Sequence, residues 1–353
     1  MNKWFTIWLV FMSMVSSAQT LGGNSVFNFL KLSNTPQLSA LGGVNVSQTS
    51  NDVGLAFNNP ALLRPSMHTQ MNAVFNDFYG GIKVYHLSLG YHHEKLKTSF
   101  SWGLNYLDYG NTAETDASGN VLGKFRPTDW VMQVSASRSY LDNWNYGATL
   151  KFISSNYGQY SSTGLAMDIG ILFRDTSHLF SASFVAKNMG TQLKKYEGTD
   201  PDDLPFELQA GITKRLEKAP FSFSLTAQRL HHFDIMYNDT SFNNENGYEN
   251  RSNKKFSLDK LISHLVLAAT VYAGDRVEVM AGYNFLRRKE LSTGNTANGL
   301  NGFSLGAGVL LGKLEIRYAR AYYQSNTAYN QLGLNMKLNE YFGLGKFGQR
   351  IGW

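Results

Sequence analysis

The amino-acid sequence predicts an all-β protein, a transmembrane antiparallel up-and-down β-barrel. Three observations predict it. From residue 70 onward, apolar and polar residues alternate in about fourteen segments of strand length. The connectors between these segments are alternately short and long. No window after the first residues has the roughly 18–20 consecutive apolar residues of a spanning helix. Since only helices and closed barrels satisfy their backbone polar groups in hydrocarbon, a barrel remains.

The alternation places one apolar and one polar face on each segment. In residues 144–152, for example, Trp144, Leu150 and Phe152 share one face, while Asn145 and Lys151 share the other. Side chains of a strand point to opposite faces with period two. A polar lumen within a lipid-facing apolar band accommodates the charges on the polar faces. The inward-facing charged residues would be Lys151, Asp168, Lys187, Glu207, Glu278, Glu315, Arg317 and Lys337.

Aromatic residues near the segment ends are expected to form the girdles at the two membrane surfaces. Aromatic residues make up 14% of the chain and charged residues only 16%, against roughly 25% charged in ordinary soluble domains. The expected girdle residues are Tyr85, Tyr109, Trp130, Trp144, Tyr272, Tyr322 and Tyr341.

The connectors orient the barrel. Those after even-numbered segments are short, around residues 94–96, 141–143, 175–177, 216–219, 274–275 and 312. Those after most odd-numbered segments are long and polar: Gly110 to Thr128, Met189 to Leu204, His231 to Lys260, and Arg287 to Gly299. Tight turns are typical of the periplasmic side and longer loops of the outer side. With an even strand number, both ends of the barrel lie on the periplasmic side.

The first residues resemble a secretory signal. Lys3 supplies a positive charge, an apolar stretch follows, and Ser16, Ser17 and Ala18 precede a cut near Gln19. A single membrane anchor is the alternative, but the apolar run is too short for it. We therefore expect Sec-type export, signal-peptide cleavage and an integral outer-membrane location.

Composition excludes several classes of function. The chain has no cysteine, so disulfides, thiol nucleophiles and thiolate metal sites are excluded. Its net charge of +6 is spread over many segments instead of forming a basic stripe, so no nucleic-acid partner is expected.

Motifs that suggest catalysis or metal binding have simpler interpretations. The G-x-S-x-G pattern around Ser304 lies within an alternating segment, whereas a nucleophile elbow requires a turn followed by a helix. The pairs His92–His93 and His231–His232 lack the helical spacing of a zinc protease. The oxygen-rich residues 239–253 lack the ordered spacing of an EF-hand. We expect no catalytic, cofactor or metal site and no enzyme activity.

The N-terminal stretch resembles a known signature. Residues 40–63 read ALGGVNVSQTSNDVGLAFNNPALL, with an Asn59-Pro60-Ala61 step whose proline favours a helix start. This is similar to the N-terminal signature of FadL-like outer-membrane barrels. That resemblance implies a fourteen-stranded barrel with a short segment packed in the lumen. The implied division is a signal peptide at 1–18, a plug-like segment at 19–69, the barrel at 70–338 and a periplasmic tail at 339–353.

Four blocks and the C-terminus resemble the PorQ family, outer-membrane barrels of the type IX secretion system of Bacteroidetes. The blocks are residues 22–43, 109–125, 185–198 and 204–230, and the closing residues LNEYFGLGKFGQRIGW also fit. The resemblance implies a barrel that anchors a surface protein similar to PorZ. It also implies action with PorU- and PorV-like proteins in modifying and attaching exported cargo, and no catalytic residue.

Two readings of the function follow. The first is a non-enzymatic barrel that presents a docking surface on the loops from Gly110 to Thr128, Met189 to Leu204, and His231 to Lys260. The second is a FadL-like transporter of hydrophobic small molecules, because one fold can serve both roles. Transport needs an apolar path through the lumen, and the inward-facing residues named above are polar. A surface hydrolase, the third reading, lacks an acid–base–nucleophile set in the sequence.

Overall fold

The computed structural model describes residues 25–116, 118–235, 257–291, 299–322 and 328–342. The proposed signal peptide, residues 343–353 of the proposed tail, and residues 239–253 lie outside the described residues.

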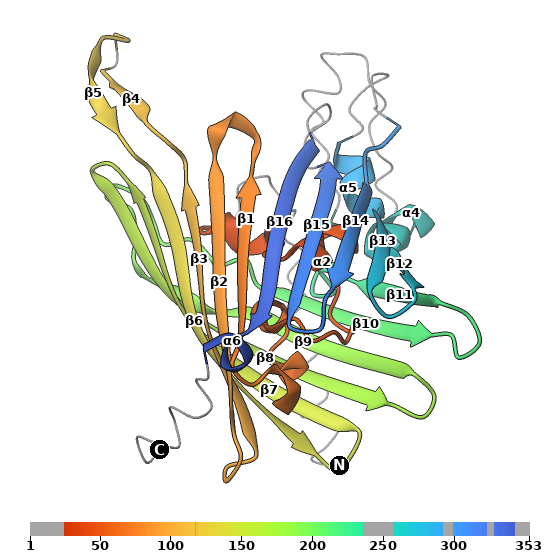
Figure 1. Cartoon of the computed structure of the whole chain (residues 1–353). Coiled ribbons are helices and arrows are strands. Elements are labelled where there is room, and N and C mark those ends of the chain that lie inside the picture. Colours follow the sequence, from red (N-terminus) through yellow and green to blue (C-terminus); the bar gives the residue numbers. More distant parts are fainter. Residues whose placement is uncertain (1–24, 117, 236–256, 292–298, 323–327, 343–353) are drawn as a thin grey trace, which may run out of the picture.

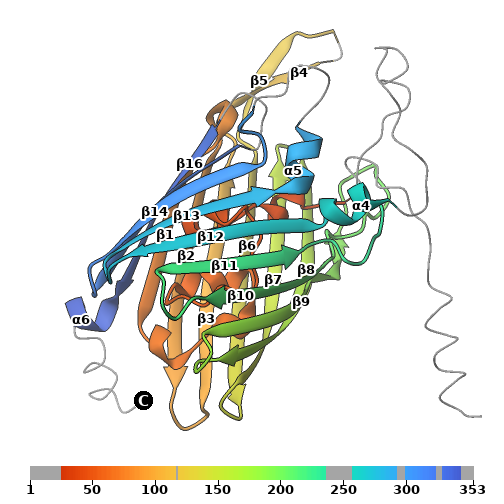
Figure 2. The same ribbon diagram turned by 90° about the vertical axis from the view of Figure 1, so that its right-hand side faces the viewer.

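A closed antiparallel barrel of fourteen strands forms the body of the protein (Figures 1 and 2). Each strand pairs with its neighbours in the chain, and β1 pairs with β16 to close the barrel. The fold class and strand number predicted from the sequence are confirmed. The barrel strands are β1 (Gln70–Asp77), β2 (Lys83–His93), β3 (Thr98–Asp108), β6 (Thr128–Tyr140), β7 (Trp144–Tyr157), β8 (Tyr160–Asp175), β9 (Phe180–Lys194), β10 (Glu207–Arg215), β11 (Phe221–Ala227), β12 (Leu265–Ala273), β13 (Val277–Asn284), β14 (Phe303–Leu310), β15 (Leu314–Tyr322) and β16 (Ala328–Lys337).

Short helices occupy the lumen and the ends of the barrel. The described helices are η1 (Asn28–Lys31), α2 (Pro36–Ala40), η2 (Val53–Phe57), η3 (Pro60–Leu62), η4 (Pro65–Met67), η5 (Tyr79–Gly81), α4 (Leu258–Ser263), α5 (Phe285–Glu290) and α6 (Leu338–Phe342). In the part of the chain that the structure describes, every helix is too short to cross a bilayer.

The two mouths of the barrel differ as the connectors predict. The turns after β2, β6, β8, β10, β12 and β14 are short and define the short-turn mouth. The opposite, long-loop mouth has the separate hairpin β4 (Thr112–Thr115) and β5 (Val121–Phe125), which projects beyond the barrel (Figure 1).

The strands bury one face in the lumen and expose the other. In β7, Leu150 is 56% exposed and the adjacent Lys151 is 0% exposed. A polar side chain buried between large exposed apolar ones is the reverse of a soluble sheet and typical of a barrel in lipid. Lys151, Asp168, Lys187, Glu278 and Arg317 are all buried inside the barrel, as predicted.

Two strands end one residue before the alternating pattern does, and two tyrosines face the opposite side of the wall from the one expected. The alternation of β13 continues to Phe285, but the strand ends at Asn284, whose side chain accepts a hydrogen bond from Arg287 N and so starts α5 at Phe285. Likewise the last strand ends at Lys337, because α6 begins at Leu338. Tyr272 and Tyr109 were expected in lipid-facing girdles.

Those two tyrosines instead face the lumen. The hydroxyl of Tyr272 accepts from Gln48 Nε2 at 3.3 Å, and that of Tyr109 donates to Asp129 Oδ2 at 2.6 Å. Both lie at inward positions of the alternation, with Leu107 and Thr270 as the preceding buried residues, and each has a polar partner inside the barrel.

Candidate functional site

The candidate site is the lumen with the N-terminal segment that fills it, residues 25–69. Its short helices begin where side chains cap them. Thr35 Oγ1 accepts from Leu38 N at 3.2 Å before Pro36 opens α2, and Asp52 Oδ1 accepts from Gly54 N at 2.9 Å at η2. Such caps satisfy backbone N–H groups that have no partner within a short helix. The segment can therefore be buried without a long helix.

The Asn-Pro-Ala step touches the barrel wall. Asn59 Oδ1 accepts from Ala61 N at 3.0 Å, and Asn59 Nδ2 donates to Val46 O and to Ser183 Oγ, each at 2.8 Å. One side chain thus caps η3, links two parts of the segment and fastens them to β9. Sequence analysis gave this step a structural role only, and the structure places all three residues in the buried interior.

Glycines of the wall make room for the segment. A Cβ atom added at Gly147 would lie 2.6 Å from Pro60 C, and one added at Gly282 would lie 2.2 Å from Gly42 N. Both of these neighbours are backbone atoms, which cannot move aside independently. Glycine is therefore needed at Gly147 of β7 and Gly282 of β13, because the backbone of the segment packs too close to the wall for a side chain.

A buried ion-pair network joins the segment to the strands near the short-turn mouth. Arg317 Nε lies 2.6 Å from Glu278 Oε1, and Arg317 Nη1 lies 2.6 Å from Glu315 Oε2. From the N-terminal segment, Asp52 Oδ2 lies 3.8 Å from the same Nη1. Breaking a buried pair leaves an uncompensated charge, so this network holds the segment in place.

A second network lies across β7, β8 and β9. Lys151 Nζ is 2.6 Å from Asp168 Oδ2 and 2.9 Å from Asn188 Oδ1. The register shifts here, so that Lys187 and Asn188 together oppose Asp168. This bulge turns two consecutive side chains inward. Lys187 Nζ then reaches Asn58 Oδ1 of the segment at 2.6 Å.

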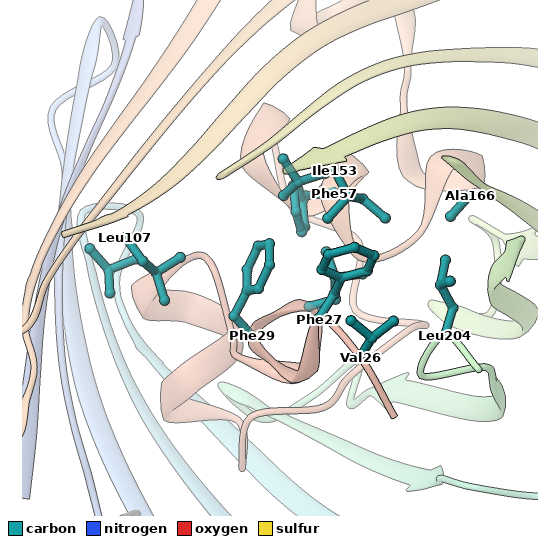
Figure 3. Packing of buried hydrophobic residues seen from close by; sticks show 11 residues of the cluster. Val26, Phe27, Phe29, Phe57, Leu107, Ile153, Ala166 and Leu204 are labelled. Carbon is teal, nitrogen blue, oxygen red and sulfur yellow. The ribbon is translucent and has the colours of Figure 1, made fainter. Parts of the chain in front are cut away.

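Toward the long-loop mouth the lumen is apolar, which sequence analysis missed. The rings of Phe27, Phe29 and Phe57 lie among wall residues such as Leu107 and Ile153 (Figure 3). The lumen therefore has an apolar part, whereas the sequence analysis named only polar inward-facing residues. A single apolar residue at an inward position, amid polar ones, gave little signal in the sequence.

A cavity of about 550 Å³ lies above this cluster at the long-loop mouth. Leu204 lines both the cavity and the apolar cluster. Charged residues line it too, including Lys31, Glu207 and Arg229. His231 also lines the cavity. Burial and, to a smaller extent, repulsion from His232 lower the pKa of the His231 imidazole to about 4.

The three candidate docking loops differ in structure. Residues 110–128 form the β4–β5 hairpin, on which Val121 is 66% and Leu122 67% exposed. In the second loop, β9 continues to Lys194, so only the remainder is irregular. Of the third loop, residues 236–256 lie outside the described part of the chain, and α4 occupies its end.

The other motifs occupy ordinary positions. Ser304 is a buried residue of β14 and accepts from Arg287 Nη1 at 3.2 Å. His92 and His93 end β2, and His92 Nδ1 lies 3.0 Å from Ser99 Oγ. Within the described residues, no group of three His, Asp or Glu side chains is close enough to hold a metal ion.

No protein-family model and no curated protein matches the sequence. Solved structures are similar in fold. The CymD monoaromatic hydrocarbon channel matches with a TM-score of 0.51 and 13% identity, covering 88% of this chain and 97% of that one. The Pseudomonas putida toluene transporter TodX matches at 0.48 and 10%, covering 86% and 97%. A Pseudomonas aeruginosa FadL homologue matches at 0.45 and 13%, covering 86% and 98%.

This chain therefore has the fold of a fourteen-stranded outer-membrane β-barrel, and it is similar in fold to the CymD monoaromatic hydrocarbon channel. Identities this low concern the fold and leave the function to the residues of the lumen and the loops.

Proposed function

We propose that this protein is an outer-membrane barrel that is closed by its own N-terminal segment and holds a protein partner at the cell surface. One observation carries the proposal: residues 26–67 are packed against wall glycines and tied to the strands by two buried polar networks. Because the lumen is filled in this way, the partner would bind at the long-loop mouth. The blocks that resemble PorQ support a place in a type IX secretion system, with a PorZ-like partner and PorU- and PorV-like proteins.

The projecting hairpin is where we place the first contact with the partner. Val121 and Leu122 are consecutive residues of β5, so they expose apolar side chains on both faces of the hairpin beyond the barrel. Large apolar side chains on a projecting polar hairpin have no role in closing the barrel. Large apolar side chains exposed on a projecting segment are available to contact a partner.

The test is retention of the partner on cells. The protein would be purified in detergent from its native outer membrane, and the co-purified surface protein identified by mass spectrometry. Replacing Val121 and Leu122 together by asparagine should release that protein into the medium. The matched control, Lys124→Gln, changes an exposed residue of the same strand and should retain it. Retention by both variants would remove the hairpin from the docking surface.

A second candidate function is transport of hydrophobic small molecules. The comparisons favour it over the docking role, because the similar structures are named as a hydrocarbon channel and a toluene transporter. A specific feature of this chain also favours it, since Leu204 joins the outer cavity to an apolar cluster inside the lumen. Movement of Phe27 and Phe29 out of that cluster would open an apolar path.

Uptake separates the two candidates. Cells lacking the protein would be compared with complemented cells for uptake of a radiolabelled monoaromatic hydrocarbon and for surface retention of the co-purifying protein. Loss of the surface protein with unchanged uptake supports the docking role. Loss of uptake with unchanged surface proteins supports the transporter and overturns the docking proposal.

A further inference from the structure

A separate cavity lies at the opposite, short-turn mouth. It measures about 190 Å³ and lies between the ends of β8, β9, β10, β11 and β12 and residues 48–49 of the N-terminal segment. Its lining includes Arg174, Arg215, Thr213, Ser222 and Gln48. Neither the docking role nor the transport role uses this cavity.

Both arginines continue the inward-facing series of their strands. Arg174 follows the buried positions Gly170 and Leu172 in β8, and Arg215 follows Gly211 and Thr213 in β10. Two guanidinium groups on different strands therefore face one small space. Arg215 also packs against Tyr272, with its guanidinium carbon 4.3 Å from the ring centroid. Such a cation–π contact favours this position of the guanidinium group.

The positive charge of this cavity is only partly offset by the described residues. Neither Arg174 nor Arg215 forms an ion pair with a carboxylate among them. The acidic residue of the lining is Asp175, whose carboxylate lies 2.6 Å from His178 Nδ1 and accepts from the backbone N–H groups of Ser177 and His178. One carboxylate beside two guanidinium groups leaves a net positive charge. Glu278 is the acidic neighbour of Tyr272, and it is already paired with Arg317.

A third guanidinium group stands nearby. Arg64 of the N-terminal segment donates through Nη2 to Ser50 O, while its buried Nε has no partner among the described residues. Burial and repulsion from Arg174 lower the pKa of the Arg64 guanidinium. The cations at this mouth thus repel one another, and a bound anion would relieve that repulsion.

We propose that the short-turn cavity binds an oxyanion of the phosphate class, held by Arg174 and Arg215. The planar guanidinium fork matches the oxygens of such a group and bonds it through two N–H donors. The hydroxyl groups of Thr213 and Ser222 add neutral polar contacts. Pockets for whole drug-sized ligands measure roughly 300–1,000 Å³, so this smaller cavity fits a single anionic group.

The anion has two sources if the short-turn mouth faces the periplasm. One is free phosphate, and the other is the headgroup of an anionic phospholipid from the inner leaflet. Both present the same phosphate oxygens to the arginines. The experiment therefore needs one arm for each source.

The first arm is calorimetric titration of inorganic phosphate into the full-length protein in detergent. The second arm is native mass spectrometry of phosphatidylglycerol retained by the protein after reconstitution with it. The test variant is Arg174→Gln with Arg215→Gln. The matched control is Arg138→Gln, an exposed residue on the other face of β6 at the same mouth.

Phosphate binding that weakens by about tenfold or more in the double variant, and not in the control, supports the free anion as ligand. No phosphate binding, with phosphatidylglycerol retained by wild type and control but lost from the double variant, supports the lipid headgroup. Absence of both ligands from the wild-type protein overturns the proposal, as does equal binding by the double variant.

Folding is checked by the heat-modifiable migration of the barrel in gels. If the double variant does not fold, the single variant Arg215→Gln decides the question, because its side chain is exposed and its loss leaves no buried gap. It should bind the ligand several-fold more weakly than wild type. Binding equal to wild type would overturn the site.

Discussion

Arg317 Nε lies 2.6 Å from Glu278 Oε1, and both side chains are only 4% exposed. This bond joins β15 to β13 inside the barrel, and the same guanidinium group contacts Asp52 of the N-terminal segment. It therefore couples closure of the lumen to stability of the wall. Arg317 thus contacts both the barrel wall and the N-terminal segment, which are far apart in the chain.

Arg317→Met should destabilise the protein by about 3–5 kcal/mol, because three carboxyl groups lose their buried cation. The measurement is unfolding in denaturant, monitored by tryptophan fluorescence and by heat-modifiable migration in gels. Arg320→Met, on the exposed face of the same strand, serves as the control and should change stability little. Equal effects of the two substitutions would show that the network does not hold the segment.

Gly282→Ala should loosen the N-terminal segment from the wall. The added Cβ would lie 2.2 Å from Gly42 N and 2.4 Å from Leu41 C, so the segment must shift. Overpacking of this kind costs about 1–3 kcal/mol. Conductance in planar bilayers should rise above that of wild type.

Gly123→Ala is the control for that substitution. Gly123 lies in the β4–β5 hairpin, and its nearest neighbour would be Glu114 Oε2 at 3.7 Å. This variant should conduct like wild type. Unchanged conductance and stability in Gly282→Ala would mean that the segment tolerates displacement without opening the lumen.

Asn59→Ala should cost about 1–3 kcal/mol, because it removes a helix cap and two donated hydrogen bonds. Asn59→Ser keeps a capping oxygen and loses the two donors to Val46 and Ser183, so its effect should fall between those of wild type and the alanine variant. Thermal unfolding of the three proteins checks the order. A serine variant as unstable as the alanine variant would assign the effect to the donors alone.

Phe27→Ala should create a cavity in the apolar part of the lumen. Its ring is buried and contacts the wall beside Gly164, and truncation of a buried phenylalanine costs about 3–5 kcal/mol. The measurement is binding of a fluorescent hydrophobic probe together with unfolding in denaturant. Leu122→Ala, an exposed apolar truncation on the hairpin, is the control. Loss of stability without probe binding would mean that the segment collapses into the space.

The predicted orientation can be tested on cells because the chain has no cysteine of its own. Ser118→Cys, in the hairpin turn, should react with a membrane-impermeant maleimide on intact cells. Asp142→Cys, in the short turn between β6 and β7, should react only after the outer membrane is permeabilised. The reverse pattern would invert the barrel and place the arginine cavity outside.

The sequence by itself determined the barrel. Period-two alternation depends only on neighbouring residues, so the lipid-facing Leu150 and the luminal Lys151 could be assigned without a structure. The lengths of the connectors can also be read directly along the chain, and they predicted the two unlike mouths. The Asn59-Pro60-Ala61 step was recognisable because a cap followed by proline is a local signal.

The tertiary structure alone decided what fills the lumen. Asp52 meets Arg317, and Phe27 packs beside Gly164, only because closure of the barrel brings together residues far apart in the chain. The ends of strands were also decided there, as at Asn284, where a capping bond outweighs the alternation. The arginine cavity has the same origin, since Arg174 of β8 and Arg215 of β10, which are separated by β9, line one cavity only in the folded barrel. Contacts of this kind carry no periodic signal, which is why the sequence could not show them.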